Sequence, residues 1–150
     1  MTLYEFLKFL HVVLAIVAIG ANATYGLWLA RAAREPEHTA YALKGIKILD
    51  DKIANPAYAL LLVTGFAMVI ESDIPMDTFW IAAALVLFVI LVVLALVGYT
   101  PTLRKQIAAV EAGRLDSDEY RALSKRGSVL GAVLGVLVIV IVFLMVTKPT

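Results

Sequence analysis

The chain has 150 residues, of which 62% are hydrophobic and 17% are charged, and its formal net charge is +1. Soluble domains use about 45–50% apolar and about 25% charged residues, so this composition predicts an integral membrane protein. The small net charge gives no basis for nucleic-acid binding. The absence of cysteine excludes disulfides, thiolate metal sites, iron–sulfur clusters and covalently attached haem.

Four stretches are long and apolar enough to cross a bilayer, which takes about 20 residues as a helix. The sequence therefore predicts an all-α four-helix transmembrane bundle formed by one domain, residues 1–150. The first span is expected to be retained rather than cleaved as a signal peptide, because Glu5 weakens its positive start. Helical spacing upstream of the short second span extends that helix into the interface, with a kink or restart at Asn55–Pro56. The predicted spans are Leu3–Leu29, Pro56–Ile70, Phe79–Tyr99 and Gly127–Val146.

Basic residues are concentrated in the first and third loops, whereas the second loop, ESDIPMD, has none. By the positive-inside rule, loops one and three face the cytoplasm and both termini lie outside, which fits a cell inner (plasma) membrane. Tyr58 and Tyr99 lie near predicted span ends, where tyrosine rings favour the interface.

The third loop is polar but helically periodic, so spans three and four are expected to extend beyond the lipid as cytoplasmic helices. Gly113 reads as a helix stop. Asp116 followed by Glu119 predicts a capping box for the next helix.

One face of the first span collects most of its polar residues when the chain is counted in helical steps of three and four. This stripe is expected to face the bundle, because polar side chains are costly in lipid. Within it, His11 fits an interhelical hydrogen bond, axial ligation of a haem iron, or proton handling. Asn22 and Tyr25 are the other candidate cofactor-binding residues, and His11 is the candidate metal ligand. The stripe comprises Tyr4, Lys8, His11, Ala15, Ala18, Asn22 and Tyr25.

Small residues in the later spans predict close helix packing. The fourth span carries Gly127, Gly131 and Gly135 at every fourth position, a pattern typical of close helix approach. Thr64–Gly65 in the second span predicts a second close contact, with the Thr64 hydroxyl bonded back to its own helix. The helix that packs on the glycine row is left open by the sequence: it belongs to this chain or to another copy.

Several short segments in this order resemble the small four-span membrane proteins grouped as domain of unknown function 2269. Through that group the chain is similar, more distantly, to the HemJ-type protoporphyrinogen oxidases and the copper-resistance D-like membrane domains. The HemJ resemblance implies haem b on the first-span histidine, here His11. That branch also uses a third-span lysine, and no lysine lies between Lys52 and Lys105 here. The segments are Leu10–His11 with Gly20, Asn55–Pro56–Ala57 with Thr64–Gly65, DEYRAL before the fourth span, and the ending LMVTKP.

Three functional hypotheses follow. The first is a membrane protein that binds haem b or another redox cofactor, such as a quinone, through the stripe of the first span. The second is a structural or accessory subunit that forms a homo-oligomer or docks on a larger membrane complex through the glycine row. The third is a small proton-coupled transporter with His11 in the proton path. Motifs of soluble enzymes are absent, and with the missing lysine this favours a protein without enzymatic activity.

Overall fold

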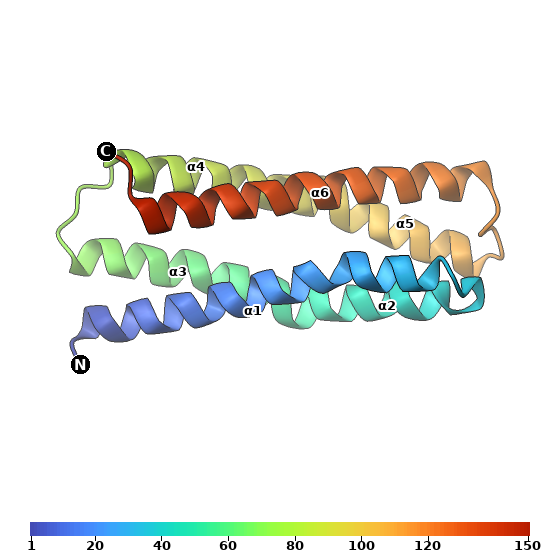
Figure 1. The fold of residues 1–150 in the computed structure, drawn as a ribbon, viewed down its shortest axis with the longest axis horizontal. Helices are drawn as coiled ribbons and strands as arrows, with labels where there is room; N and C mark the ends of the chain where they lie inside the picture. The colour runs from blue at the N-terminus through green and yellow to red at the C-terminus, as the bar shows by residue number, and fades with distance from the viewer.

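The computed structural model describes all 150 residues and is built from four long helical rods without strands (Figure 1). Each rod is long and apolar enough to cross a membrane, which confirms the predicted all-α membrane bundle. Each predicted span lies within one rod. The rods are α1 (Leu3–Ala32); η1 (Pro36–His38), α2 (Thr39–Leu49), η2 (Asp50–Ala54) and α3 (Asn55–Glu71); α4 (Phe79–Val93), η3 (Leu94–Tyr99) and α5 (Thr100–Glu111); and α6 (Asp118–Thr147).

The two middle rods each contain a π-helical segment, and each segment ends just before a proline. Proline has no N–H and its ring clashes with the preceding turn of an α-helix. The wider π turn relieves this clash, because the N–H of Asn55 reaches back to the carbonyl of Asp50, and the N–H of Thr100 reaches back to Ala95. The predicted restart at Asn55–Pro56 is therefore a change of helix type within a continuous rod.

The predicted extension of spans three and four is present as α5 and the first turns of α6. Gly113 lies just after the end of α5 and has a positive φ of 71°, a conformation that glycine adopts freely. The capping prediction was wrong by one residue: Ser117, rather than Asp116, caps α6 by accepting a hydrogen bond from the N–H of Tyr120. Ser117 takes this role because its short hydroxyl lies three residues before that N–H.

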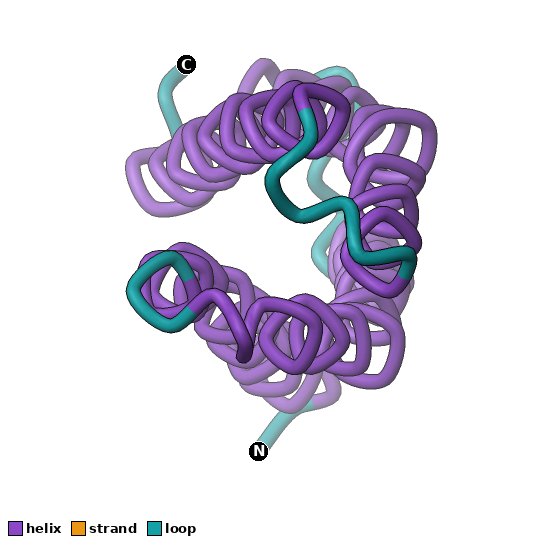
Figure 2. Tube along the Cα trace, turned by 90° about the vertical axis from the view of Figure 1, so that its right-hand side faces the viewer, coloured by secondary structure: helices purple, strands orange, loops and turns teal.

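The rods form two hairpins that pack together mainly at one end. In the first hairpin α1 packs on α3, and in the second α4 and α5 pack on α6. The hairpins meet mainly through α2 and α5, with a smaller contact between α1 and α6. The backbones of α3 and α4 stay apart, and the edge-on ring pair of Tyr58 and Phe88 bridges them. Viewed along the rods, the helices form a ring that is open on the side of α1 and α6 (Figure 2). Both termini lie at the end opposite the α2–α5 junction (Figure 1).

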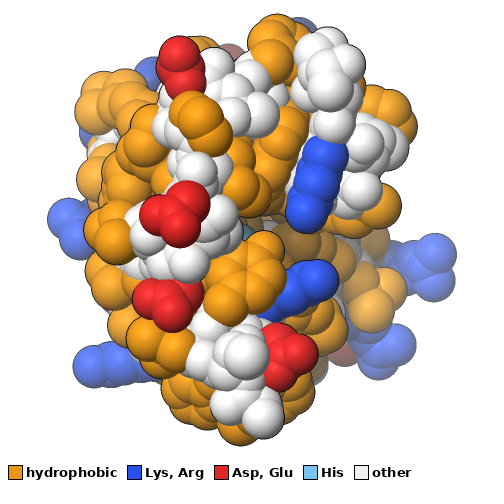
Figure 3. Space-filling model, turned by 90° about the vertical axis from the view of Figure 1, so that its left-hand side faces the viewer, with side chains coloured by type: hydrophobic (Ala, Val, Ile, Leu, Met, Phe, Trp, Pro, Cys, Tyr) orange, Lys and Arg blue, Asp and Glu red, His pale blue; other side chains and the backbone are white.

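The largest buried cluster lies at that junction and comprises Tyr25, Leu43, Ile46 and Leu103. Elsewhere little of the chain is covered, since only 21 of 150 residues are buried. Many large apolar side chains are exposed along the rods. Acidic side chains are visible among apolar ones at the end that carries the termini (Figure 3). An apolar exterior of this extent is suited to lipid.

Candidate ligand cavity

A cavity of about 1440 Å³ lies between the two hairpins. All four rods contribute to its wall, which is mostly hydrophobic. Its size exceeds the roughly 300–1,000 Å³ of ordinary small-molecule pockets. The cavity lies within the ring of helices, with α1 and α3 on one side and α4, η3 and α6 on the other.

The glycine row of α6 forms part of this wall. A Cβ atom added to Gly135 would meet nothing within 4 Å, and one added to Gly131 would only touch the ring of Tyr99 at 4.0 Å. Gly127 is different, because its added Cβ would lie 3.1 Å from Oε1 of Gln106 in α5. Within the chain, the row therefore packs on a helix at one glycine and widens the cavity at the other two.

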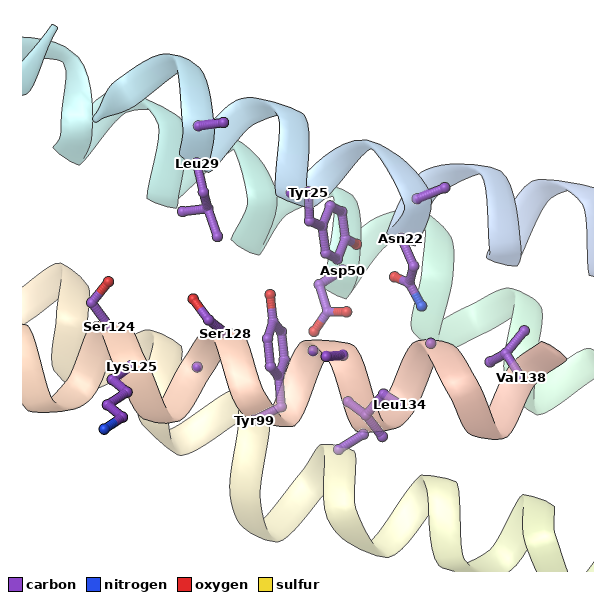
Figure 4. Close-up of a pocket in the computed structure, with 18 of the residues that line it drawn as sticks. Asn22, Tyr25, Leu29, Asp50, Tyr99, Ser124, Lys125, Ser128, Leu134 and Val138 are labelled. Atoms are coloured by element: carbon purple, nitrogen blue, oxygen red, sulfur yellow. The ribbon is translucent and has the colours of Figure 1, made fainter. Parts of the chain in front are cut away.

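Two side chains of α1 bring polar atoms to the opposite wall. The amide nitrogen of Asn22 donates a 2.8 Å hydrogen bond to the hydroxyl of Tyr58 in α3. The amide oxygen of Asn22 is buried and has no hydrogen-bond partner, and the same is true of the Tyr25 hydroxyl. Both residues line the cavity (Figure 4). The wall thus carries unsatisfied polar groups at one level of the membrane-spanning region.

An acid completes this polar cluster. Asp50, the first residue of η2, is 7% exposed and accepts a 3.4 Å hydrogen bond from the side-chain amide of Asn55. Tyr25 from α1 and Tyr99 from η3 lie on either side of its side chain (Figure 4). We use the name polar cluster for Asn22, Tyr25, Asp50, Tyr58 and Tyr99.

His11 lies outside the cavity, in the contact between α1 and α3. Its Nδ1 is 2.8 Å from Oγ1 of Thr64. The Thr64 hydroxyl donates its single hydrogen to the backbone carbonyl of Leu60, at 2.8 Å, as the sequence predicted for this residue. Thr64 therefore accepts from Nδ1–H of His11, and the Nε2 lone pair of the imidazole is free.

The structure thus separates residues that the sequence placed on one stripe. Asn22 and Tyr25 both line the cavity. His11 instead packs on Thr64 and Gly65 of α3, and a Cβ atom added to Gly65 would lie 3.4 Å from Cε1 of His11. The stripe itself faces inward except for Lys8, which is exposed.

Three residues of the polar cluster were not predicted from the sequence. Tyr58 and Tyr99 were expected at the membrane interface, but both line the cavity. Asp50 was read as part of an interfacial helix. The sequence does contain a signal for Asp50, because it lies in the middle of a series of residues spaced by three and four, which is the spacing of one helix face. All members of this series are buried: Thr39, Leu43, Ile46, Asp50, Ala54, Ala57, Leu61 and Thr64.

The fold and the cavity together are those of an integral membrane protein whose four helical rods enclose a space lined by the polar cluster. The chain matches the family model described as a predicted integral membrane protein (DUF2269) over residues 5–149, and it belongs to that family. No curated protein and no solved structure matched the chain. The similarity to HemJ-type oxidases and to copper-resistance D-like domains stays a prediction.

Proposed function

We propose that this protein binds a lipid-soluble ligand with a polar head in the cavity between its hairpins. The observation that carries the proposal is the pair of buried, unpartnered atoms in the wall, Oδ1 of Asn22 and the hydroxyl of Tyr25. Leaving a buried polar atom unpaired costs about 1–3 kcal/mol, and a lipid chain offers no partner. A ligand head that bonds to these atoms removes that cost.

The apolar part of such a ligand has a matching surface. Gly131 and Gly135 leave space along α6, and side chains such as Phe88 and Leu91 of α4 supply apolar area. Burial of apolar surface contributes about 25 cal/mol per Å² where the alternative is water, but much less against lipid. Selectivity over bulk lipid therefore depends on the head, and we place the head at the polar cluster.

A photoreactive alcohol tests this proposal. Purified protein is irradiated with a twelve-carbon alcohol that carries a diazirine, and the labelled peptides are mapped by mass spectrometry. We expect labels on cavity-lining segments of α1 and α6. Gly135→Leu should reduce them, because its side chain enters the cavity. The matched control is Gly20→Leu: its added Cβ also meets nothing within 4 Å, but Gly20 does not line the cavity. If the Gly135→Leu variant is labelled as strongly as the wild type, the proposal is contradicted.

Haem b is a second candidate, favoured by the free Nε2 of His11. A hydrogen bond at the other ring nitrogen is what orients histidines that ligate metals. The cavity does not serve this candidate, because His11 is about 12 Å along α1 from Ile19, the first residue of the lining. An absorption spectrum of protein from haem-replete cells, oxidised and then reduced, tests it: a Soret band lost in His11→Ala supports haem, and a featureless spectrum contradicts it.

We also propose the orientation that the positive-inside rule gives, with the α2–α5 junction cytoplasmic and both termini outside the plasma membrane. The cysteine-free chain makes this directly testable. Single cysteines at Glu37 and Thr150 are treated in intact cells with a membrane-impermeant maleimide. Reaction at position 150 and protection at position 37 support the orientation, and the reverse pattern contradicts it.

A further inference from the structure

The polar cluster contains a buried acid for which the chain provides no cation. Asp50 takes part in no salt bridge, and the Asn55 amide at 3.4 Å is its hydrogen-bond donor. Lys47, one helical turn earlier, pairs with Asp51 instead. A carboxylate has about four acceptor positions. Asn55 occupies one and the Tyr25 hydroxyl interacts with the same carboxyl group, so Asp50 still has acceptor positions left for a guest.

Aromatic rings surround this acid. Tyr25 reaches it from α1 and Tyr99 from η3 (Figure 4). Tyr58 lines the same cavity and packs edge-on against Phe88 of α4, with ring centroids 6.3 Å apart. The faces of aromatic rings attract cations, most strongly where water is excluded. An acid among tyrosines favours a positively charged guest over a neutral one.

The hydrogen-bonding atoms that lack a partner in the cavity wall also favour a positively charged guest. In its ionised form Asp50, like Oδ1 of Asn22, only accepts hydrogen bonds, and the Tyr25 hydroxyl both accepts and donates. Two basic residues line the cavity, but neither is available to Asp50: Arg121 bonds to Asp118 at 3.2 Å, and the Lys125 side chain points away from the cluster (Figure 4). The missing partner is therefore a positively charged donor.

We propose that the ligand is a lipophilic amine in its protonated form, with the ammonium group at Asp50, Asn22 and Tyr25 and the apolar body along the glycine wall. An ammonium has three donors, which matches the three acceptors. This inference rests on the proposed function and names the class of its ligand.

The test compares two heads on one body. The diazirine alcohol described above and its amine analogue are used to label purified protein at pH 7, and the labels on the cavity segments are counted. Hydrogen bonds to charged groups are stronger than neutral ones, so we expect about tenfold more labelling by the amine, which corresponds to about 1.4 kcal/mol. Asp50→Asn should lower amine labelling to the level of the alcohol. Asp51→Asn, which changes the exposed neighbour paired with Lys47, should leave amine labelling as it was.

Competition keeps the inference testable if Asp50→Asn does not fold. Tetraphenylphosphonium and tetraphenylborate have similar shapes and opposite charges. In the unmodified protein, the cation should displace the amine label and the anion should not. Equal labelling by amine and alcohol, or equal competition by both ions, overturns the cationic ligand and leaves the proposed function intact. Absence of cavity labelling by both heads overturns the two together.

Discussion

The amide nitrogen of Asn22 and the hydroxyl of Tyr58 form a 2.8 Å hydrogen bond between α1 and α3. This bond fixes which end of the amide group faces the cavity. With the nitrogen engaged, the oxygen lies on the side of Tyr25 (Figure 4). A contact between two helices thus also determines the hydrogen-bonding character of the cavity wall.

A double-mutant cycle measures that bond. Asn22→Leu and Tyr58→Phe should each destabilise the protein, and the double variant should lose less than the sum of the two. We expect a coupling free energy of about 0.6–1.7 kcal/mol, the range of interhelical bonds in membranes. Unfolding in mixed micelles with increasing dodecyl sulfate gives the values. Tyr41→Phe is the control because Tyr41 is 76% exposed, and strictly additive effects would contradict the coupling.

Thr64→Val removes the acceptor of His11 while keeping the shape of the side chain. We expect a loss of about 1 kcal/mol, because the imidazole N–H is left without its partner. The ¹⁵N spectrum of the imidazole provides a second measurement: the wild type should carry its proton on Nδ1. Thr24→Val is the matched control, since Thr24 is exposed and bonds only to the carbonyl of Ala21 in its own helix. A proton on Nε2 in the wild type would refute the tautomer deduced above.

The α2–α5 junction should depend on apolar packing more than on its ion pair. Leu103 is 2% exposed, so Leu103→Ala should cost about 2–5 kcal/mol. The salt bridge between Lys44 and Glu111 spans the same junction at 2.5 Å, but both side chains are about half exposed. Lys44→Ala should therefore cost less than about 1 kcal/mol. Unfolding in dodecyl sulfate compares the two, and a larger loss for Lys44→Ala would reverse this ranking.

Gly131→Leu distinguishes the cavity from self-association. Gly131 faces the cavity, so we expect the mass of the purified protein, measured by light scattering in detergent and in nanodiscs, to be the same as that of the wild type. Ligand labelling should fall in the same variant. A change of mass instead would support the hypothesis that the glycine row joins two copies or docks on a larger complex.

The sequence was sufficient for the rods and for the inward stripe of α1, because both depend on periodicity within one segment. Asn22 and Tyr25 were found in this way, and they lie where the stripe placed them. Gly113 was also predicted, since the positive φ of a helix stop is a local requirement.

The rest of the site depends on relationships between segments that periodicity does not contain. Asp50 continues the buried face of α2, but this spacing alone does not distinguish an acid in a cavity from one at the membrane interface. Tyr58 and Tyr99 carry the signature of interfacial rings, and nothing local distinguishes an interface from a polar cavity between hairpins. The spacing between the two hairpins, which leaves room for the cavity, is a property of helices that each look ordinarily apolar.

The π-helical segment η2 determines the phase between the two halves of its rod. In an α-helix one residue corresponds to a rotation of about 100°. A π turn closes over one more residue than an α turn. If all five residues of Asp50–Ala54 took α-helical geometry, α3 would therefore turn by nearly that angle relative to α2. Tyr58 and Thr64 would then leave α1 together, and Asn22 and His11 would lose their partners in a single step. The π turn, which accommodates the extra residue, keeps the two interhelical bonds in register.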